Sequence, residues 1–407
     1  MKLILDISIN HTGVEHRWFN KDGVFFDKAT GSYNNRDAKE REFYFYNNEN
    51  NTYYAWAGFD TLPTLNYTSE ALREVIYKAQ DSVLRKWLKP PYCIDGWRFD
   101  VADVFARKDE VQLAHEIWPE IRRSIREENP DAYILAEDWT DCTQYLQGKE
   151  WDSPMNYFGC GRVLRSFLGI PDFFLQRNDP LRNVQYKMTA KDVEARVMQY
   201  LAKLPYALWQ NQFNLIDSHD LPRVHNYDIV NPEEYRGAVI MQFMLVGTPS
   251  VYYGDEVGID GGVEGDEGYR HPMPWREIPG RKQETFAFYQ KLMHLKQEKE
   301  ALKEGGMKFL YAQDYIVSLA RFDGKEAYIA VMSTDDREQW ITLPVGAIGV
   351  DAEQFSVAEQ PEKASDDRFG GQAEEMFGRA ICCEKVDEKH IRMKVEAHQA
   401  YLIRCAM

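Results

Sequence analysis

The chain has 407 residues and a formal net charge of −16, with 65 acidic and 49 basic side chains. Its length exceeds one average domain, which predicts a large domain and a smaller one. The acidic charge argues against nucleic acid or an anionic membrane as partner, because both would repel the chain. No apolar run approaches the roughly 20 residues of a membrane span, so no membrane partner is expected.

The six cysteines are sparse for this length and show no metal-ligand spacing; they are Cys93, Cys142, Cys160, Cys382, Cys383 and Cys405. We therefore expect reduced thiols and a cytoplasmic protein. His11 and His16 suggest a metal site at first sight, but they lack the helical HExxH context. The sequence predicts no metal site and no cofactor; calcium is left open, without support from the residues.

The first element is a short apolar strand, Leu3 to Leu5, which ends in Asp6 with Asn10 and His11 just beyond. From Thr12 to Tyr67 the pattern is irregular and rich in aromatic residues. Such a long excursion is uncommon unless it is functional. For any single aromatic residue in it, packing is a better interpretation than sugar stacking.

Apolar residues at helical spacing from Leu72 to Leu88 predict a helix, which leads into the stretch Asp95-Gly-Trp-Arg-Phe-Asp-Val-Ala-Asp103. Here a strand carries Arg98 and Asp100 two residues apart, so both point to the same side. The guanidinium is expected to keep Asp100 ionised, as a nucleophile requires. Taken alone, the stretch is explained equally well by a surface ion pair at a strand end.

The same pattern recurs along the chain. Tyr133 to Ala136 ends in Glu137, and Phe213 to Ile216 leads into Asp217-Ser-His219-Asp220. Further expected elements are helices at Leu113–Ile125, 191–208 and 233–246, the last with Asn231 as N-cap and Pro232 at its first position, and strands at 155–157 and 249–253. Strands that alternate with helices imply a parallel sheet. Polar residues gathered at the strand ends favour a (β/α) barrel with its active site at that face.

The pattern changes near Gly305 and Gly306. Five segments from Phe309 to Ile403 alternate apolar and polar residues between turn-formers, as half-exposed antiparallel strands do. We expect a catalytic barrel over 1–304, with an inserted subdomain at 12–67, and a C-terminal all-β sandwich over 305–407. The Gly-rich acidic stretch from Gly258 to Gly268 is expected to be a solvated loop.

Four ordered motifs resemble the signature regions of the alpha-amylase family of glycoside hydrolases: Asp6-Ile-Ser-Ile-Asn-His11, Gly96-Trp-Arg-Phe-Asp100, Ile134-Leu-Ala-Glu137 and Phe213-Asn-Leu-Ile-Asp-Ser-His-Asp220. Leu62-Pro-Thr-Leu-Asn66 resembles a further motif of the oligosaccharide-acting branch. Within that branch, the segments 56–88 and 271–275 are most similar to maltodextrin glucosidases, with neopullulanases and cyclomaltodextrinases close behind.

The resemblance implies a TIM barrel, (β/α)8, that lacks its first two strand–helix units here, because only five residues precede Asp6. We interpret the sequence as a fragment or as a mis-assigned start. Six barrel strands are then expected, with unpaired edges at the Asp6 strand and at 249–253. Low solubility and poor turnover of maltodextrins by the isolated chain follow from that interpretation.

The resemblance also assigns roles. Asp100 is the nucleophile and Glu137 the acid and base of a retaining hydrolase of α-1,4, and possibly α-1,6, glucosidic bonds, with carboxyl groups roughly 5 to 5.5 Å apart. The apolar residues before Glu137, with Trp139 nearby, should raise its pKa. Asp220 stabilises the transition state. Asp6, His11, Arg98, Trp139, His219 and Arg270 are the expected substrate-binding or bracing residues, Arg270 from the resemblance only.

Two alternatives stay open. A transglycosylase of the same family shares the first half-reaction, so the sequence does not separate it from a hydrolase. A non-catalytic carbohydrate-binding relative or inactive fragment is opposed by the intact Asp100, Glu137 and Asp220. The expected partner is an oligosaccharide; whether the protein forms a homodimer is left open.

Overall fold

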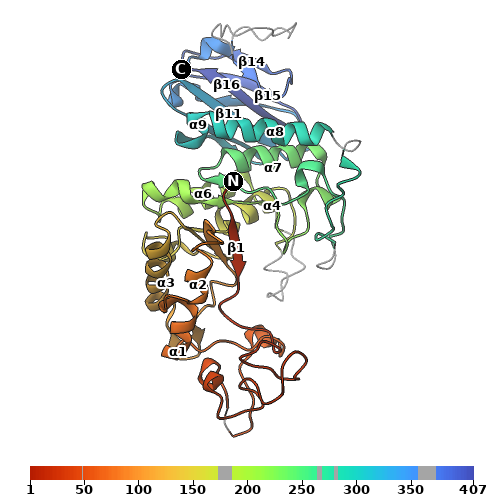
Figure 1. Cartoon of the computed structure of the whole chain (residues 1–407). Helices are drawn as coiled ribbons and strands as arrows, with labels where there is room; N and C mark the ends of the chain where they lie inside the picture. The colour runs from red at the N-terminus through yellow and green to blue at the C-terminus, as the bar shows by residue number, and fades with distance from the viewer. Residues whose placement is uncertain (48, 173–185, 264–267, 279–282, 356–372) are drawn as a thin grey trace. The chain divides into compact units, whose positions relative to one another are not determined.

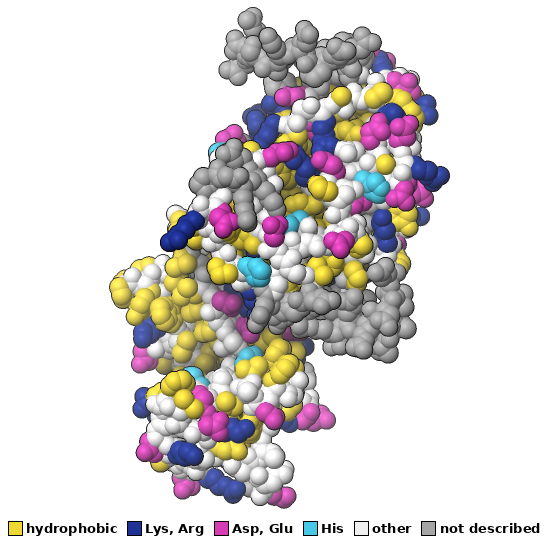
Figure 2. Space-filling model, turned by 90° about the vertical axis from the view of Figure 1, so that its right-hand side faces the viewer, with side chains coloured by type: hydrophobic (Ala, Val, Ile, Leu, Met, Phe, Trp, Pro, Cys, Tyr) yellow, Lys and Arg dark blue, Asp and Glu magenta, His cyan; other side chains and the backbone are white. Residues whose placement is uncertain are grey.

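The computed structural model describes residues 1–47, 49–172, 186–263, 268–278, 283–355 and 373–407. The chain divides into two compact units, Met1–Met155 and Asn156–Met407, which we describe separately (Figure 1). The boundary predicted between residues 304 and 305 falls inside the second unit and stays a prediction. Acidic and basic side chains are interspersed over the face shown in Figure 2.

The first unit is built on a parallel sheet in the order β1 (Ile4–Ile7), β2 (Gly96–Phe99), β5 (Tyr133–Ala136) and β6 (Ser153–Pro154). The three apolar runs predicted as strands are confirmed, since Asp6 pairs with Arg98 and Arg98 with Leu135 in the ladder. The first strand differs in its bounds, because it continues through Asp6 to Ile7 and does not end before the acid. The strand predicted at 155–157 instead lies at Ser153–Pro154. Asn156 ends it, because its side chain accepts a hydrogen bond from Gly159 N and opens a short π-helix.

The helix predicted from Leu72 to Leu88 is wrong as a single element. It consists of α1 (Glu70–Arg73), the π-helix η3 (Glu74–Lys78) and α2 (Val83–Lys86). Ala79 adopts an extended conformation and ends η3. Arg85 stabilises the break, because its Nε donates to Tyr77 O at 3.1 Å while its guanidinium pairs with Glu127 and Glu128. The predicted helix at Leu113–Ile125 is confirmed as α3 (Ala114–Glu128).

The segment 12–67 folds around its own aromatic residues. Phe19 is fully buried, and its ring centroid lies 4.8 to 5.9 Å from those of Tyr33, Tyr44, Tyr46 and Tyr53. The backbone here is held by two short 3-10 helices, η1 (Lys39–Phe43) and η2 (Trp56–Gly58), and by isolated bridges such as His11 to Thr64. These rings therefore pack the subdomain, as expected for most of its aromatic residues.

The second unit contains a two-stranded parallel sheet, in which β7 (Phe213–Asn214) pairs with β8 (Thr248–Pro249). β8 is shorter than the predicted 249–253 because its partner ends at Asn214, whose carbonyl accepts the last ladder bond from Ser250 N. Whether strand–helix units are missing from the barrel stays a prediction.

The helices of this unit include α4 (Arg162–Phe167), α6 (Ala190–Leu201), α7 (Pro232–Met244), α8 (Gln283–Glu298) and α9 (Glu300–Lys303). The predicted cap of α7 is confirmed, since the Asn231 side chain accepts from Glu233 N and Glu234 N. The helix predicted at 191–208 ends at Leu201. A 3-10 helix, η6 (Tyr206–Asn211), follows Pro205, and a residue before proline is disfavoured in the α conformation.

The chain ends in an antiparallel β domain of two sheets. One has the order β13 (Glu374–Glu375), β16 (Ala400–Ala406), β11 (Glu326–Ser333), β10 (Ile316–Phe322) and β9 (Gly306–Gln313); the other has the order β12 (Gln339–Leu343), β15 (Ile391–Val395) and β14 (Cys382–Lys385). Helix α7 packs closely on the first sheet at Gly237, where a Cβ atom would lie 2.8 Å from Met332.

Two cations bind backbone carbonyls near helix ends, one from the sheet and one from helix α8. Arg321 on β10 is fully buried and donates to Met244 O, Leu245 O, Lys303 O, Gly305 O and Gly306 O at 3.1 to 3.4 Å. Lys296 donates to Leu302 O at 2.9 Å, and burial holds its pKa well below the usual value. Most of these carbonyls lie in the last turn of α7 or α9 or just after it, where backbone acceptors lack intrahelical partners. Among the described residues, no helix is both long and apolar enough to cross a membrane.

Candidate active site

The acidic residues of the first unit gather where its parallel strands end. The ladder extends one residue past each strand, because Asp100 N donates to Ile7 O at 3.0 Å and Glu137 N donates to Phe99 O at 2.9 Å. Neighbouring residues in a parallel ladder place their side chains on the same face. Asp6 and Arg98 are paired in register, and Asp100 and Glu137 follow at the carboxyl edge.

Arg98 is the centre of this group and contacts three carboxylates. Its Nη1 donates to Asp6 at 3.0 and 3.1 Å and to Asp100 Oδ1 at 2.7 Å, and its Nη2 lies 2.9 Å from Glu137 Oε2. Its Nε contacts Met155 Sδ at 3.4 Å. The pairing of Arg98 with Asp100, inferred from their two-residue spacing, is present, and Asp6 braces the same guanidinium.

Glu137 lies deeper than Asp100. It is 6% exposed, whereas the Asp100 side chain is 31% exposed. Glu137 Oε1 accepts from Trp139 Nε1 at 3.0 Å, and Oε2 accepts from Val101 N at 2.9 Å. Burial raises the pKa of Glu137, although Arg98 and these donors oppose the shift. A raised pKa agrees with the predicted role of Glu137 as proton donor. Trp139, predicted to bind substrate, donates its hydrogen bond to Glu137.

Sequence reasoning missed the role of Val101. Its φ angle is +44°, in the left-handed region that β-branched residues rarely adopt. This conformation turns its backbone N–H toward Glu137 Oε2. Strained backbone of this kind costs about 1 to 3 kcal/mol and is typical of functional sites. No residue type in the stretch signals the turn, so the sequence alone could not have found it.

Two further acids lie beside Glu137 and were not singled out. Burial, with the charges of Asp138 and Glu137, raises the pKa of Asp103 to about 7. Asp138 is 3% exposed, and its Oδ1 accepts from Thr140 N and Thr140 Oγ1 at 2.7 and 2.8 Å. The available signal was local: Asp103 closes the Asp100 motif and Asp138 directly follows Glu137.

His11 lies at the edge of the aromatic subdomain. Its ring stacks on Trp56 with centroids 5.3 Å apart, and it contacts Ser8 Oγ at 3.4 Å and Asn10 Nδ2 at 3.3 Å. Burial lowers its pKa, partly offset by the charge of Asp100. A neutral imidazole held in this way can donate a hydrogen bond to a sugar hydroxyl.

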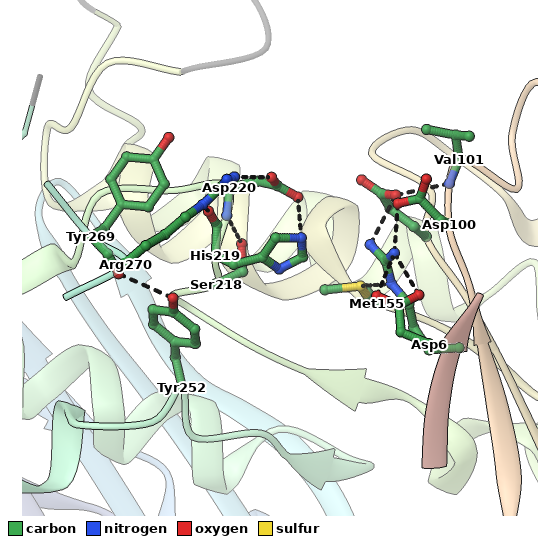
Figure 3. A network of polar contacts seen from close by, with 12 residues as sticks. Asp6, Asp100, Val101, Met155, Ser218, His219, Asp220, Tyr252, Tyr269 and Arg270 are labelled. Carbon is green, nitrogen blue, oxygen red and sulfur yellow. Dashed lines mark hydrogen bonds and ion pairs between the residues drawn. The ribbon is translucent and has the colours of Figure 1, made fainter. Parts of the chain in front are cut away.

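The second unit carries its own polar group around Asp220 (Figure 3). Asp220 Oδ2 lies 3.2 Å from His219 Nε2, and Oδ1 accepts from Arg270 Nη2 at 3.1 Å. Arg270 Nε also donates to His219 O at 2.7 Å, so the guanidinium contacts both His219 and Asp220. Arg270, expected only from the resemblance, therefore lies against the predicted acid.

Buried side chains fix the loop of residues 217–224, which carries His219 and Asp220. Ser218 Oγ accepts from Asp220 N at 3.1 Å and contacts the hydroxyl of the buried Tyr157 at 2.9 Å. Asp217 pairs with Arg165 at 2.9 Å and accepts from Val224 N at 3.0 Å. The buried Asp217 side chain thus links the two ends of the 217–224 loop.

Asp217, His225 and Asp255 have ligand atoms within 4.8 Å of one another and form a candidate cation cluster. Its charges argue against that role. Arg165 pairs with Asp217, and Arg223 pairs with Asp255 at 2.5 Å, so each carboxylate already has a guanidinium. A divalent cation would add uncompensated positive charge to a buried site, which is costly. We interpret the cluster as a structural ion-pair network.

Every predicted site residue lies in one of these groups: Asp6, His11, Arg98, Asp100, Glu137 and Trp139 in the first unit, and His219, Asp220 and Arg270 in the second. Their catalytic and binding roles stay predictions, as does the carboxyl separation of a retaining enzyme. The loop predicted at Gly258–Gly268 is only partly described, because residues 264–267 lie outside the described residues.

Comparisons with known proteins identify related chains. The model of the alpha amylase catalytic domain matches residues 1–278. A cyclomaltodextrinase of a Bacillus species is 34% identical over 286 residues, which are 70% of this chain and 46% of that protein. Neopullulanase 2 of Thermoactinomyces vulgaris is 29% identical over 358 residues, 86% of this chain and 54% of that protein. The chain thus spans about half the length of these curated relatives.

Among solved structures, the native form of the Nostoc punctiforme debranching enzyme superposes with a TM-score of 0.74 at 25% identity. The superposition covers 99% of this chain and 76% of that one. A catalytic barrel fold followed by an antiparallel β domain is therefore shared with these proteins.

Proposed function

From its membership of the alpha-amylase family, whose catalytic domain it matches over residues 1–278, we propose a function for this chain. It is a retaining glycoside hydrolase that cleaves α-glucosidic bonds in maltodextrins. The relatives are named for cyclomaltodextrins and pullulan, which supports maltodextrin-type oligosaccharides as the substrate class. The α-1,4 bond is the proposed target, with the α-1,6 bond as a second substrate.

One observation carries the proposal: two carboxylates share the Arg98 guanidinium but differ in environment. Asp100 makes the 2.7 Å contact and is partly exposed, so it is available to attack a sugar carbon. Glu137 is buried, and burial raises its pKa, so it retains a proton at higher pH than an ordinary glutamate. A retaining glycosidase needs such a pair, one carboxylate charged and one protonated.

The proposed reaction proceeds in two steps. In the first, an Asp100 oxygen forms a bond to the anomeric carbon while the glycosidic oxygen leaves with the Glu137 proton, which yields a glycosyl ester and a shortened sugar. In the second, Glu137 takes a proton from water, whose oxygen bonds to the same carbon as the ester bond breaks. Each displacement attacks the face opposite its leaving group and inverts the anomeric carbon, so the two inversions together retain the α configuration.

The other residues hold the two carboxylates in position and bind the sugar. Arg98 and Asp6 fix the nucleophile, and the Val101 N–H and the Trp139 indole fix the acid. By family position, we propose that Asp220 and His219 bind sugar hydroxyls and stabilise the oxocarbenium-like transition state, a preorganised electrostatic effect. His11 would meet the primary hydroxyl. A cytoplasmic location remains part of the proposal, supported by the six cysteines, which form no disulfide among the described residues.

The test is the stereochemistry of hydrolysis. Protein that contains this chain is given maltotriose, and the first-released reducing sugar is observed by proton NMR before mutarotation. Release of the α anomer, with Asp100→Asn as inactive control, would support the proposal, and release of the β anomer would refute it. Product analysis at high maltose concentration separates hydrolysis from transglycosylation.

A further inference from the structure

We propose that Asp103 positions the acid Glu137 and forms a pH-sensitive latch. While the Asp103 carboxyl group is protonated, the turn of residues 101–106 stays closed on Glu137, and loss of that proton opens the turn. The inference rests on the proposed function, because Glu137 matters here as the proton donor. Both residues belong to the first unit.

Two hydrogen bonds close the turn on Glu137. Val101 N donates to Glu137 Oε2 at 2.9 Å, and Ala102 N donates to Glu137 O at 3.2 Å. The first bond holds the carboxyl group of the acid, and the second holds its backbone. Asp103 is the next residue in the chain, so a displacement of Asp103 would strain both bonds.

Backbone strain is present at both ends of the turn. The φ angles of Val101 and Ala106 are +44° and +55°, in the left-handed region that residues other than glycine rarely adopt. Strain of this kind persists only where the surrounding contacts enforce it. The buried Phe105 anchors the turn, whereas Val104 reaches the surface. Asp103 therefore lies one residue from solvent, in a turn whose closure is opposed by strain.

Asp103 faces other acids and has no cation as partner. Burial raises its pKa to about 7, and the charges of Asp138 and Glu137 add to that shift. Among the residues that the structure describes, no lysine, arginine or histidine forms an ion pair with Asp103. Both neighbours are buried, Asp138 at 3% and Glu137 at 6% exposure. Water therefore screens the repulsion poorly once Asp103 ionises.

The nearby arginines act on other acids. Arg98 contacts three carboxylates, Glu137 among them. The charge of Arg107 acts on Asp138, whose pKa burial still raises. Neither guanidinium compensates Asp103, so a proton does. An exposed aspartate ionises at lower pH than the closed Asp103, so the open turn gains as the pH rises toward about 7 and gains no further above it.

Amide hydrogen exchange tests the latch without substrate. In protein that contains this chain, protection factors are measured for peptides spanning residues 100–106 from pH 5 to 8.5, with intrinsic exchange rates divided out. We expect protection to fall about tenfold per pH unit up to pH 7 and to level off above it. In Asp103→Asn, which is neutral at every pH, protection should stay within about twofold. Asp138→Asn removes the facing charge while its Oδ1 can still accept from Thr140, so it should also retain protection.

Kinetics test the link to the acid. For maltotriose, kcat/KM of each protein is normalised to its own value at pH 5. The ratio of Asp103→Asn to unsubstituted protein should rise about fivefold by pH 7, the effect of one hydrogen bond to Glu137. With α-maltosyl fluoride, which needs little protonation, the ratio should stay near one. Asp109→Asn is the matched control and should follow the unsubstituted protein, because the Asp109 side chain is 75% exposed.

Each arm has an outcome that decides against the proposal. Protection that changes equally with pH in the unsubstituted protein and in Asp103→Asn, or that changes in neither, would overturn the latch. A rise of the kinetic ratio on the fluoride equal to that on maltotriose would overturn the positioning of Glu137. Because exchange is measured without substrate, a protein that hydrolyses no maltotriose would refute the proposed function, and exchange would still decide the latch.

Discussion

Replacing Glu137 with glutamine removes the proposed proton donor while nearly preserving its shape. Glu137 Oε2 faces two donors, Val101 N–H and Arg98, so the glutamine oxygen should occupy that position. Its amide NH₂ then faces the Trp139 Nε1–H, and one hydrogen bond is lost. An unsatisfied buried polar group costs about 1 to 3 kcal/mol, so the variant should fold with a modest loss of unfolding free energy.

The catalytic loss should be larger and should depend on the leaving group. General acid catalysis contributes about 10² to 10⁴ in rate, or about 3 to 5.5 kcal/mol of activation free energy. We expect Glu137→Gln to lower kcat/KM for maltotriose by that factor, relative to unsubstituted protein containing this chain. With α-maltosyl fluoride the loss should be far smaller, because fluoride needs little protonation to leave.

The pH dependence gives a second readout. Because burial raises the pKa of Glu137, its protonated form persists to higher pH, and activity on maltotriose should fall as the pH rises through that pKa. The glutamine variant should lose this alkaline limb. Glu150→Gln is the matched control. Glu150 is a half-buried glutamate that pairs with His115, and burial also raises the pKa of Glu150. Equal losses of Glu137→Gln on both substrates would refute the acid role.

Three other changes test the remaining assignments. Asp100→Asn should abolish turnover and leave the Kd for maltotriose within a small factor, and substantial residual turnover would remove Asp100 as nucleophile. His219→Asn should lower kcat more than it raises KM, because its contact tightens as charge develops; a raised KM at constant kcat would indicate uniform binding instead. Arg321→Met should lower the unfolding free energy in urea by at least about 3 kcal/mol, since several buried carbonyls lose their donor at about 1 to 3 kcal/mol each. The exposed Arg337→Met is its control, and equal stability of the two variants would contradict the capping role.

Local chemistry in the sequence determined the ends of elements. An asparagine followed by proline marks the start of α7 because both satisfy backbone groups at that end, and the structure begins the helix at Pro232. The apolar runs around Asp6 and before Asp100 and Glu137 become neighbouring parallel strands, which places Asp100 and Glu137 at one sheet edge and Asp6 beside Arg98. Antiparallel strands after Gly306 were likewise predicted from alternation, but only β12 and β15 are half exposed, whereas β10 and β11 are buried on both faces.

Tertiary structure decided how these elements are used. The spacing of Arg98 and Asp100 predicted one ion pair, but only the packed sheet brings Asp6 and Glu137 to the same guanidinium. The helix expected from Leu72 to Leu88 breaks at Ala79, because Arg85 reaches α3 and the Tyr77 carbonyl. The Val101 N–H and the shifted pKa of Asp103 also depend on neighbours distant in sequence. Periodicity and capping are set by adjacent residues, whereas burial, strain and shared charges arise only when separate segments of the chain pack together.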